Sequence, residues 1–349
     1  MRRPRLAHHA VLALFISLAG CRASSGEPSP GPAAKASPAA AAPAAGGPGT
    51  VAAQTFRSAA LGVDKSYRVY LPAGYAETDR RYPVVYLLHG ISGDESNWLE
   101  HGDLAGAADR LRLQAIVVMP DGDAGFYANS VTPARYERCM DGDSPFEEES
   151  PRASTCVRKA DYEDYVIRDL IAEVDARFRT VAERRGRAIT GLSMGGFGAL
   201  SLAMRHRDLF SSAASHSGVL ALFYAGPHPY DAARIDLLED VSRWGANAGR
   251  FGPWVRSIFG PDPKNWRAHD PATLAEQLRD GDLAIYIDCG TEDDFLLQNH
   301  AAYLHDVLTR RGIRHSYTLL PGQHDWNFWK DRIDDSLSFH AATFTAAGL

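Results

Sequence analysis

A serine framed by glycines is the first feature of the chain that could do chemistry. Residues 191–195 read Gly-Leu-Ser-Met-Gly, so Ser193 has a glycine two positions before it and another two positions after it. A short apolar stretch precedes this pentapeptide and a run of small and apolar residues follows it, which predicts a strand, a tight turn and a helix. Small residues relieve the crowding of such a turn, and the helix N-terminus favours developing negative charge. The pattern predicts that Ser193 is a nucleophile.

A serine hydroxyl is inert at neutral pH, so the pattern also calls for a base and an acid. His324 lies in a turn directly after the last predicted strand, where the base of such a site is expected. The acid is expected after the preceding strand, where Glu292, Asp293 and Asp294 stand together. Spacing does not choose among these three carboxylates. Any of them could fix the imidazole tautomer and stabilise the imidazolium.

Backbone N–H groups that bind an oxyanion leave only a positional trace in a sequence. One donor is expected at Met194, directly after the serine, and the other in the loop at 89–93, which reads His-Gly-Ile-Ser-Gly. We interpret His89 as structural support for that loop rather than as a proton carrier.

These residues must be positioned by alternating strands and helices. Apolar, β-prone runs predict strands, several of them continuous enough to be buried on both faces of a sheet, at residues 65–71, 83–88, 115–119, 188–191, 211–217, 283–288 and 315–320. Apolar positions at helical spacing predict helices at 165–178, 197–204 and 299–311. Repeated βα units indicate an α/β fold with a mostly parallel central sheet and helices on both faces.

Two long stretches do not fit this pattern and are interpreted as insertions over one end of the sheet. Residues 129–160 are polar and acidic, and residues 223–265 are rich in Gly, Pro and Trp. Long irregular segments are often binding loops or lids. Aromatic residues near the motif segments could stack on a sugar or an aromatic acyl group, although ordinary packing explains them equally well. These candidate substrate contacts are Trp98, Tyr127, Trp326 and Trp329.

The N-terminus has the pattern of a targeting segment. Three arginines lie within the first five residues, and the apolar run at 10–18 is too short to span a bilayer. Residues 18–21 then read Leu-Ala-Gly-Cys, which resembles the cleavage site of a bacterial lipoprotein signal. By that resemblance Cys21 would carry the lipid anchor, and the protein would be exported and held on the cell envelope.

Composition marks the boundary between this segment and the domain. Residues 23–49 consist mainly of Pro, Ala, Gly and Ser, and cannot bury enough surface to fold. The expected organisation is a signal peptide at 1–20, a disordered tether at 21–54 and one catalytic domain at 55–349.

Charge and cysteine content exclude several other classes of protein. The 349-residue chain has a net charge of −6 and no basic block suited to nucleic acid. Neither a metal-binding motif nor a dinucleotide fingerprint occurs, so no metal and no cofactor are expected, and the acidic residues at 141–149 are interpreted as a solvated loop. Cys139 and Cys156 flank a polar segment and are predicted to form a disulfide, whereas Cys289 is expected to be buried. Nothing in the sequence indicates an oligomeric state.

Several segments in order resemble the esterase D family, which includes S-formylglutathione hydrolases, feruloyl and tributyrin-type esterases and the related mycolyltransferases. They read LLHGISGDESNW, MPDG, GLSMGGFGAL, DCGTEDDF and PGQHDW, and the resemblance runs from about Arg68 to the C-terminal helix. It implies the α/β-hydrolase fold. It also implies that Asp293 is the acid, with Asp294 as the fallback, and that the second oxyanion donor is the N–H of Ile91.

The resemblance implies a serine carboxylesterase that acts on a small-molecule or carbohydrate-linked ester, such as an acetyl or feruloyl ester. Membrane contact is expected only through the lipid anchor. Two alternatives remain open. The same residues could transfer the acyl group to another alcohol, as in the mycolyltransferases, or the chain could be a surface-binding module with a degenerate hydrolase fold.

Overall fold

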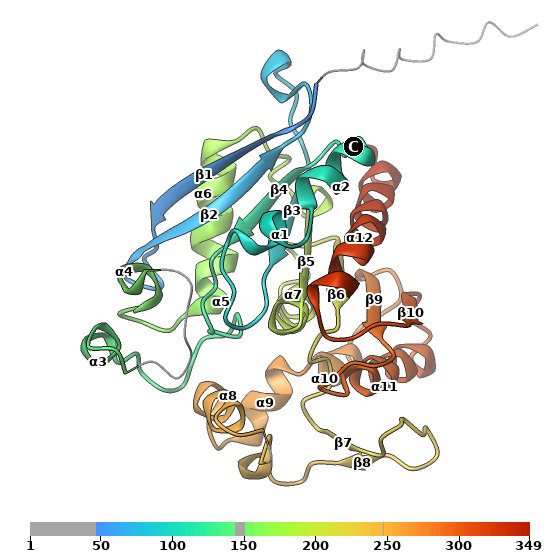
Figure 1. Ribbon diagram of the computed structural model, residues 1–349. Helices are drawn as coiled ribbons and strands as arrows, with labels where there is room; N and C mark the ends of the chain where they lie inside the picture. The colour runs from blue at the N-terminus through green and yellow to red at the C-terminus, as the bar shows by residue number, and fades with distance from the viewer. Residues whose placement is uncertain (1–46, 144–150, 247) are drawn as a thin grey trace, which may run out of the picture. The chain divides into compact units, whose positions relative to one another are not determined.

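An eight-stranded sheet forms the centre of the structure, which is a computed structural model that describes residues 47–143, 151–246 and 248–349 (Figure 1). The strand order is β1-β2-β4-β3-β5-β6-β9-β10. From β4 to β10 in that order all neighbours are parallel, whereas β2 is antiparallel to β4 and β1 to β2. The strands are β1 (Thr50–Arg57), β2 (Asp64–Leu71), β3 (Val84–Leu88), β4 (Ile116–Pro120), β5 (Arg187–Leu192), β6 (Ser212–His216), β9 (Ala284–Gly290) and β10 (Ser316–Leu320).

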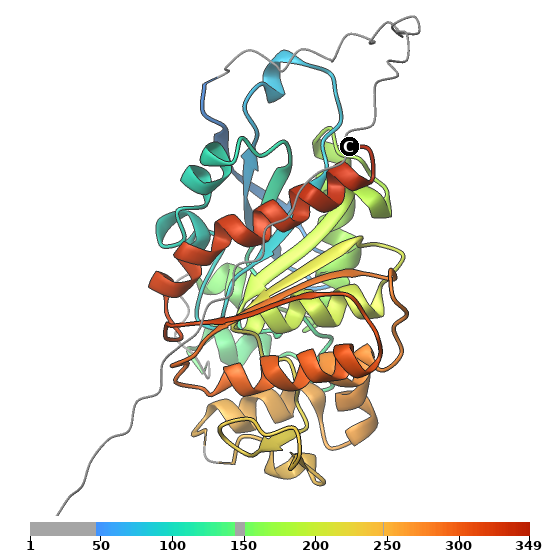
Figure 2. The same ribbon diagram turned by 90° about the vertical axis from the view of Figure 1, so that its right-hand side faces the viewer.

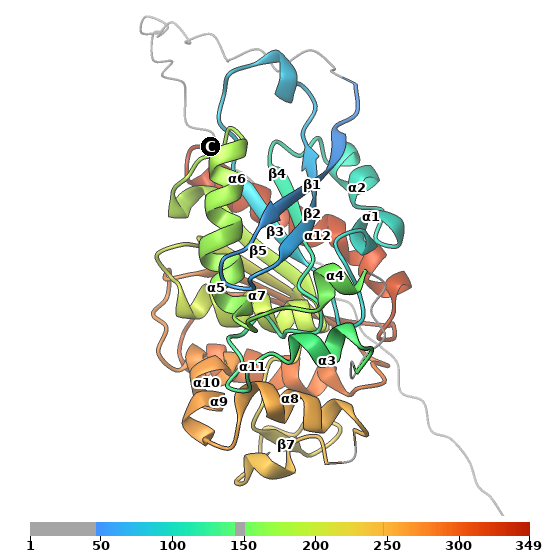
Figure 3. The same cartoon turned by 90° about the vertical axis from the view of Figure 1, so that its left-hand side faces the viewer.

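Helices cover both faces of this sheet, which confirms the predicted architecture. Successive side chains of β3 point to opposite faces. Val85 and Leu87 belong to one buried cluster, with α2 (Leu104–Arg110) and α12 (Trp326–Ala346), and Tyr86 belongs to another, with α6 (Ile171–Arg177) and α7 (Met194–Arg205). Figure 2 shows α12 crossing one face, and Figure 3 shows α6 from the opposite side.

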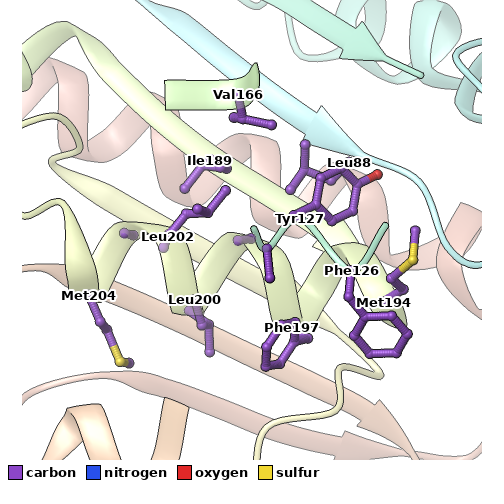
Figure 4. Close-up of a cluster of buried hydrophobic side chains, with 14 of the residues drawn as sticks. Leu88, Phe126, Tyr127, Val166, Ile189, Met194, Phe197, Leu200, Leu202 and Met204 are labelled. Atoms are coloured by element: carbon purple, nitrogen blue, oxygen red, sulfur yellow. The ribbon is translucent and has the colours of Figure 1, made fainter. Parts of the chain in front are cut away.

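Helix α7 is the element that ties the sheet to the nucleophile. All of its residues but the last are buried, and the close-up in Figure 4 shows Phe197 and Leu200 among the side chains of the larger cluster. Burial of each large apolar side chain contributes roughly 1.5–3 kcal/mol. The start of α7 is therefore held firmly against the sheet.

The other helices are short, apart from α11. They are α1 (Asn97–Glu100), α3 (Tyr136–Met140), α4 (Arg152–Thr155), α5 (Tyr162–Asp164), α8 (Phe251–Phe259), α9 (Pro263–His269), α10 (Pro271–Ala275) and α11 (Leu297–Arg310). A π-helical turn, Tyr165–Leu170, joins α5 to α6 within the predicted helix at 165–178. Among the residues that the structure describes, no helix combines the length and the apolar character that crossing a membrane requires.

The first predicted insertion contains α3 and α4. A disulfide joins Cys139 at the end of α3 to Cys156 after α4, which is the pairing predicted from the sequence. Cys289 is a buried free thiol in β9, also as predicted. The bridge closes a loop between two very short helices that could not hold each other by packing alone.

The second predicted insertion is more ordered than expected. It contains α8, part of α9 and a small antiparallel pair, β7 (Tyr224–Gly226) and β8 (Asp236–Leu237). The sequence did not predict α8 because Gly252 and Pro253 lie inside it, yet Val255, Ile258 and Phe259 form its buried face. Tertiary packing therefore outweighs the low helix propensity of two residues.

The folded region begins earlier than predicted. Strand β1 starts at Thr50, inside the segment 21–54 that was expected to be a tether. The sequence of β1 is mostly small and polar, and its exposure alternates because successive side chains point to opposite faces of the sheet. In the described sheet β1 is an edge strand, paired with β2. The predicted signal peptide, Cys21 and the rest of the tether lie outside the described residues.

Candidate active site

Ser193 lies at the sharp turn between β5 and α7. Its backbone has φ 52° and ψ −116°, and its N–H donates to the carbonyl of His216 at 2.9 Å. A Cβ on Gly195 would lie 2.6 Å from the carbonyl oxygens of Leu88 and His89, and a Cβ on Gly191 would lie 2.6 Å from the backbone of Gly195. Any larger residue at either position would push the turn away from the end of β3. Both glycines therefore allow the strained turn that exposes the Ser193 hydroxyl.

His324 lies in the turn between β10 and α12, and its ring contacts Ser193. Its Nε2 is 2.9 Å from the Ser193 Oγ, and its Nδ1 is 2.7 Å from Oδ2 of Asp293. Phe295 and Trp329 meet the imidazole edge to face, with ring centroids 4.8 and 5.0 Å away. The imidazole is therefore held by polar contacts at both of its nitrogens and by packing against two aromatic rings.

Asp293 follows β9, and its carboxylate is buried. Oδ1 accepts the backbone N–H of Phe295 at 2.9 Å and of Leu297 at 3.3 Å, while Oδ2 faces His324. The other two candidate carboxylates lie elsewhere: Glu292 accepts the N–H of Gly322, and Asp294 is exposed. Of the three acids that spacing left open, the structure brings only Asp293 to the histidine.

The two backbone amides that we expected to bind an oxyanion belong to Met194 and Ile91. Met194 is the first residue of α7, and Ile91 lines the same cleft as Ser193. Within the described part of the chain, neither amide has a hydrogen-bond partner. A Cβ on the neighbouring Gly90 would lie 3.5 Å from that of Ser193, so the loop passes close to the nucleophile. Free N–H groups beside the nucleophile are what a tetrahedral oxyanion needs.

The triad opens into a cleft of about 940 Å³. The loop after β3 forms one part of its wall, and the first turn of α12 forms another, with Trp326 and Trp329. The second predicted insertion contributes Trp244 and Phe251. This volume is large enough for an ester with a substantial acyl or alcohol part, and the aromatic walls suit an apolar or ring-shaped group.

Two predicted substrate contacts are wrong. Trp98 is buried and its Nε1 donates to the carbonyl of Leu88, while Tyr127 is buried and its hydroxyl donates to the carbonyl of His89. Neither lines the cleft. Both residues instead brace the end of β3 from within the core. Of the four candidate aromatic contacts, Trp326 and Trp329 line the cleft.

Several cleft residues were missed because only the tertiary fold brings them there. Phe295, which is 65% exposed, lies two residues after Asp293 and lines the cleft. His300 belongs to α11 and also lines the cleft. Burial and the nearby His228 lower the pKa of His300 to about 4, so this side chain is neutral at physiological pH. The local sequence carries no signal for these contacts.

A second Ser-His-Asp chain lies behind the nucleophile but is sealed. His216 Nε2 is 2.9 Å from Ser336 Oγ and His216 Nδ1 is 2.9 Å from Asp288, and all three residues are 0% exposed. No substrate can reach it. Its hydrogen-bond distances resemble those of the Ser193 site. The two Ser-His-Asp chains therefore differ in whether the serine is open to the cleft. In the described ranges, no group of three or more His, Cys, Asp or Glu residues is arranged to hold a metal ion.

The sheet topology, the serine at the turn after β5 and the His-Asp pair after later strands define an α/β-hydrolase. The chain belongs to the esterase family described as "Putative esterase", whose model matches residues 58–340.

Known relatives agree with this family. Esterase Rv1288 of Mycobacterium tuberculosis is 37% identical over 169 residues, which are 48% of this chain and 32% of that protein. The chain thus spans about a third of the length of this relative. An acetyl esterase of Caldicellulosiruptor saccharolyticus is 25% identical over 256 residues, covering 73% of this chain and 82% of the relative. Among solved structures, a ferulic acid esterase superposes with a TM-score of 0.62 at 22% identity, over 85% of this chain and 99% of its own.

Proposed function

We propose that this protein is a serine carboxylesterase that hydrolyses an acyl ester through an acyl-enzyme. The observation that carries the proposal is the unbroken chain of contacts from Ser193 Oγ through His324 to the buried Asp293, open to a cleft. The named activities of relatives, acetyl esterase among them, support the same reaction class.

In the first half of the reaction, Ser193 Oγ attacks the ester carbonyl while its proton passes to Nε2 of His324. The carbonyl oxygen becomes an oxyanion that accepts the N–H groups of Met194 and Ile91. Collapse of this intermediate breaks the bond to the alcohol, which leaves with the proton from His324. The Asp293 carboxylate stabilises the imidazolium that forms in between and does not take the proton itself.

In the second half, water replaces the alcohol. His324 takes a proton from water as its oxygen attacks the acyl-enzyme, and returns that proton to Ser193 when the acid leaves. The products are one alcohol and one carboxylic acid. An alcohol in place of this water would give acyl transfer instead, but no feature of the cleft favours that outcome.

For the substrate, we propose an acyl ester of a small molecule or a carbohydrate, with an acetyl or an aromatic acyl group. The size of the cleft and its tryptophan and phenylalanine walls support a ring-shaped group on at least one side of the ester. Relatives named acetyl esterase and feruloyl esterase support the same range.

The test is a panel of acetyl, butyryl and feruloyl esters together with an acyl glutathione, assayed with the wild-type protein and with Ser193→Ala. The proposal predicts hydrolysis of at least one oxygen ester by the wild-type protein, and a loss of at least about 10⁴-fold in kcat in the variant. Adding candidate acceptor alcohols measures transfer against hydrolysis. Equal activity of the variant and the wild-type protein would contradict the proposal.

A further inference from the structure

His89 directly follows β3, and both nitrogens of its buried ring contact backbone groups. Nδ1 lies 2.7 Å from the carbonyl oxygen of Gly90, and the N–H of Gly122 donates to Nε2 at 2.8 Å. Because neither nitrogen is free to exchange a proton with a substrate, a role in proton transfer does not fit this histidine. The contacts need another explanation.

The direction of the hydrogen bonds fixes the tautomer of His89. A backbone N–H can only donate, so Nε2 must accept from Gly122 and the ring proton must lie on Nδ1. Burial lowers the pKa of His89, although the Asp121 carboxylate, 3.8 Å from Nε2, opposes this effect. The ring is therefore neutral, and its Nδ1–H donates to the Gly90 carbonyl.

The Gly90 carbonyl belongs to the same planar unit as the N–H of Ile91. A peptide bond is rigid, so a hydrogen bond that holds the oxygen also sets the direction of the N–H on the opposite side. The N–H of Gly93 donates to the same oxygen at 3.2 Å. A hydrogen bond to a carbonyl also polarises the peptide and strengthens its N–H as a donor.

We propose that His89 is a positioning residue that aims the Ile91 N–H at the oxyanion of the reaction. This inference rests on the proposed esterase function. His89 does not touch the substrate; it acts through the Gly90–Ile91 peptide, whose carbonyl would otherwise be held only by the longer hydrogen bond from the Gly93 N–H among the contacts of the described residues.

A buried ion cluster supports the turn that contains Gly122, whose N–H donates to His89. Lys65 of β2 lies 2.8 Å from Asp121 and 2.7 Å from Asp123, and all three side chains are buried. The Asp121 carboxylate accepts the N–H of Asp123 at 3.1 Å, which shapes the turn that presents the Gly122 N–H. The orientation of the oxyanion peptide is thus set from β2, through Asp121, Gly122 and His89.

Two substitutions separate this role from simple packing. In His89→Asn the side-chain amide nitrogen can take the place of Nδ1 and still donate to Gly90. In His89→Gln the amide can reach the Gly122 N–H at the position of Nε2 but not Gly90. Complete removal of an oxyanion donor costs about 10²–10³ in turnover. For a misdirected donor we expect H89Q to lower kcat about 10- to 100-fold with KM nearly unchanged, and H89N to stay within about 5-fold of wild type.

A trifluoromethyl ketone, which forms an oxyanion on the serine, provides the second measurement. Its affinity should fall in H89Q by about the same factor as kcat, while the midpoint of the pH–rate profile stays in place. His315→Gln, at the start of the distant strand β10, controls for the loss of a histidine. Melting temperatures are recorded for every variant.

Equal losses of kcat in H89N and H89Q, or a loss confined to KM, would overturn the inference. If H89Q does not fold, H89N alone decides, because it keeps the donor to Gly90: retained affinity for the ketone supports the inference and a tenfold loss contradicts it. Hydrolysis that survives Ser193→Ala would instead overturn the proposed function, so the two failures can be told apart.

Discussion

At the scale of single residues, hydrogen-bond direction decides what each polar group can do. Asp293 accepts two backbone N–H groups on one oxygen and faces the His324 ring with the other, so the position of its carboxylate is fixed before a substrate arrives. The neighbouring acids lack these contacts. Residue type and spacing alone could not separate them.

A substitution pair tests the choice of acid. Asp293→Asn should lower kcat about 10³–10⁴-fold, because the amide favours the wrong imidazole tautomer and carries no charge. Asp294→Asn should stay within about 3-fold of wild type, since Asp294 is exposed and outside the triad. Steady-state kinetics on one ester measures both. A larger loss of kcat in D294N than in D293N would contradict the assignment of Asp293 as the acid.

The sealed Ser336 provides a matched control for the nucleophile. It contacts His216, which in turn contacts Asp288, much as Ser193 contacts His324 and His324 contacts Asp293, but Ser336 is fully buried. Ser336→Ala should therefore leave kcat within a few-fold of wild type and lower the melting temperature. Ser193→Ala should abolish most of kcat and leave the melting temperature close to that of wild type. Loss of ester hydrolysis in both variants, at equal stability, would contradict this distinction.

At the scale of elements, α12 and β6 meet through a buried histidine that couples stability to pH. His340 is 0% exposed, with Nδ1 2.8 Å from Ser212 Oγ, and burial together with His216 lowers its pKa to about 3. In the unfolded chain the pKa of this histidine is about 6.5. Between about pH 3 and pH 6.5 the ring is therefore protonated in the unfolded chain and neutral in the folded protein. The stabilising effect is complete above pH 6.5 and decreases as pH falls toward 3.

This coupling predicts a measurable difference at pH 5. Relative to pH 7, His340 should lower the free energy of unfolding by about 2 kcal/mol. Urea unfolding of wild type and His340→Gln at both pH values measures it, and only the change with pH is compared. The inference of a neutral buried ring fails if the two proteins lose the same stability between pH 7 and pH 5.

The sequence predicted the central elements well because their burial leaves a pattern. The local sequence predicts β3 and β4 from their continuous apolar runs and α7 from its small residues. It also predicts the turn at Ser193 from the glycines around it. Strand β1 and helix α8 could not be, since an edge strand needs little apolar character and α8 is stabilised by distant residues. The wrong assignment of Trp98 and Tyr127 has the same cause: proximity to a motif in sequence does not say which way a ring points.

At the scale of the whole molecule, the N-terminal segment bears on where the proposed reaction would take place. We propose that Cys21 is acylated and that the residues before β1 hold the domain on the cell envelope, at its periplasmic or extracellular face. More than one acyl chain on a single residue gives firm attachment, since one chain alone is marginal.

Changing that cysteine should release the protein without altering its chemistry. We expect the wild-type chain to sediment with membranes and to enter the detergent phase, and Cys21→Ala to lose the lipid and this partitioning. The kcat of the detergent-solubilised proteins should agree within about 2-fold, because the triad lies in the folded domain. Membrane association of the variant equal to that of wild type would contradict the anchor.

The most direct test of the central claim is to locate the acyl group during turnover. Wild-type protein is mixed with a p-nitrophenyl ester, quenched in acid within milliseconds, digested and analysed by mass spectrometry. The account predicts one acyl group on the peptide that contains Ser193, and none on that peptide in Ser193→Ala. Rapid ester hydrolysis with the acyl group on another residue, or turnover that persists in Ser193→Ala, would contradict it.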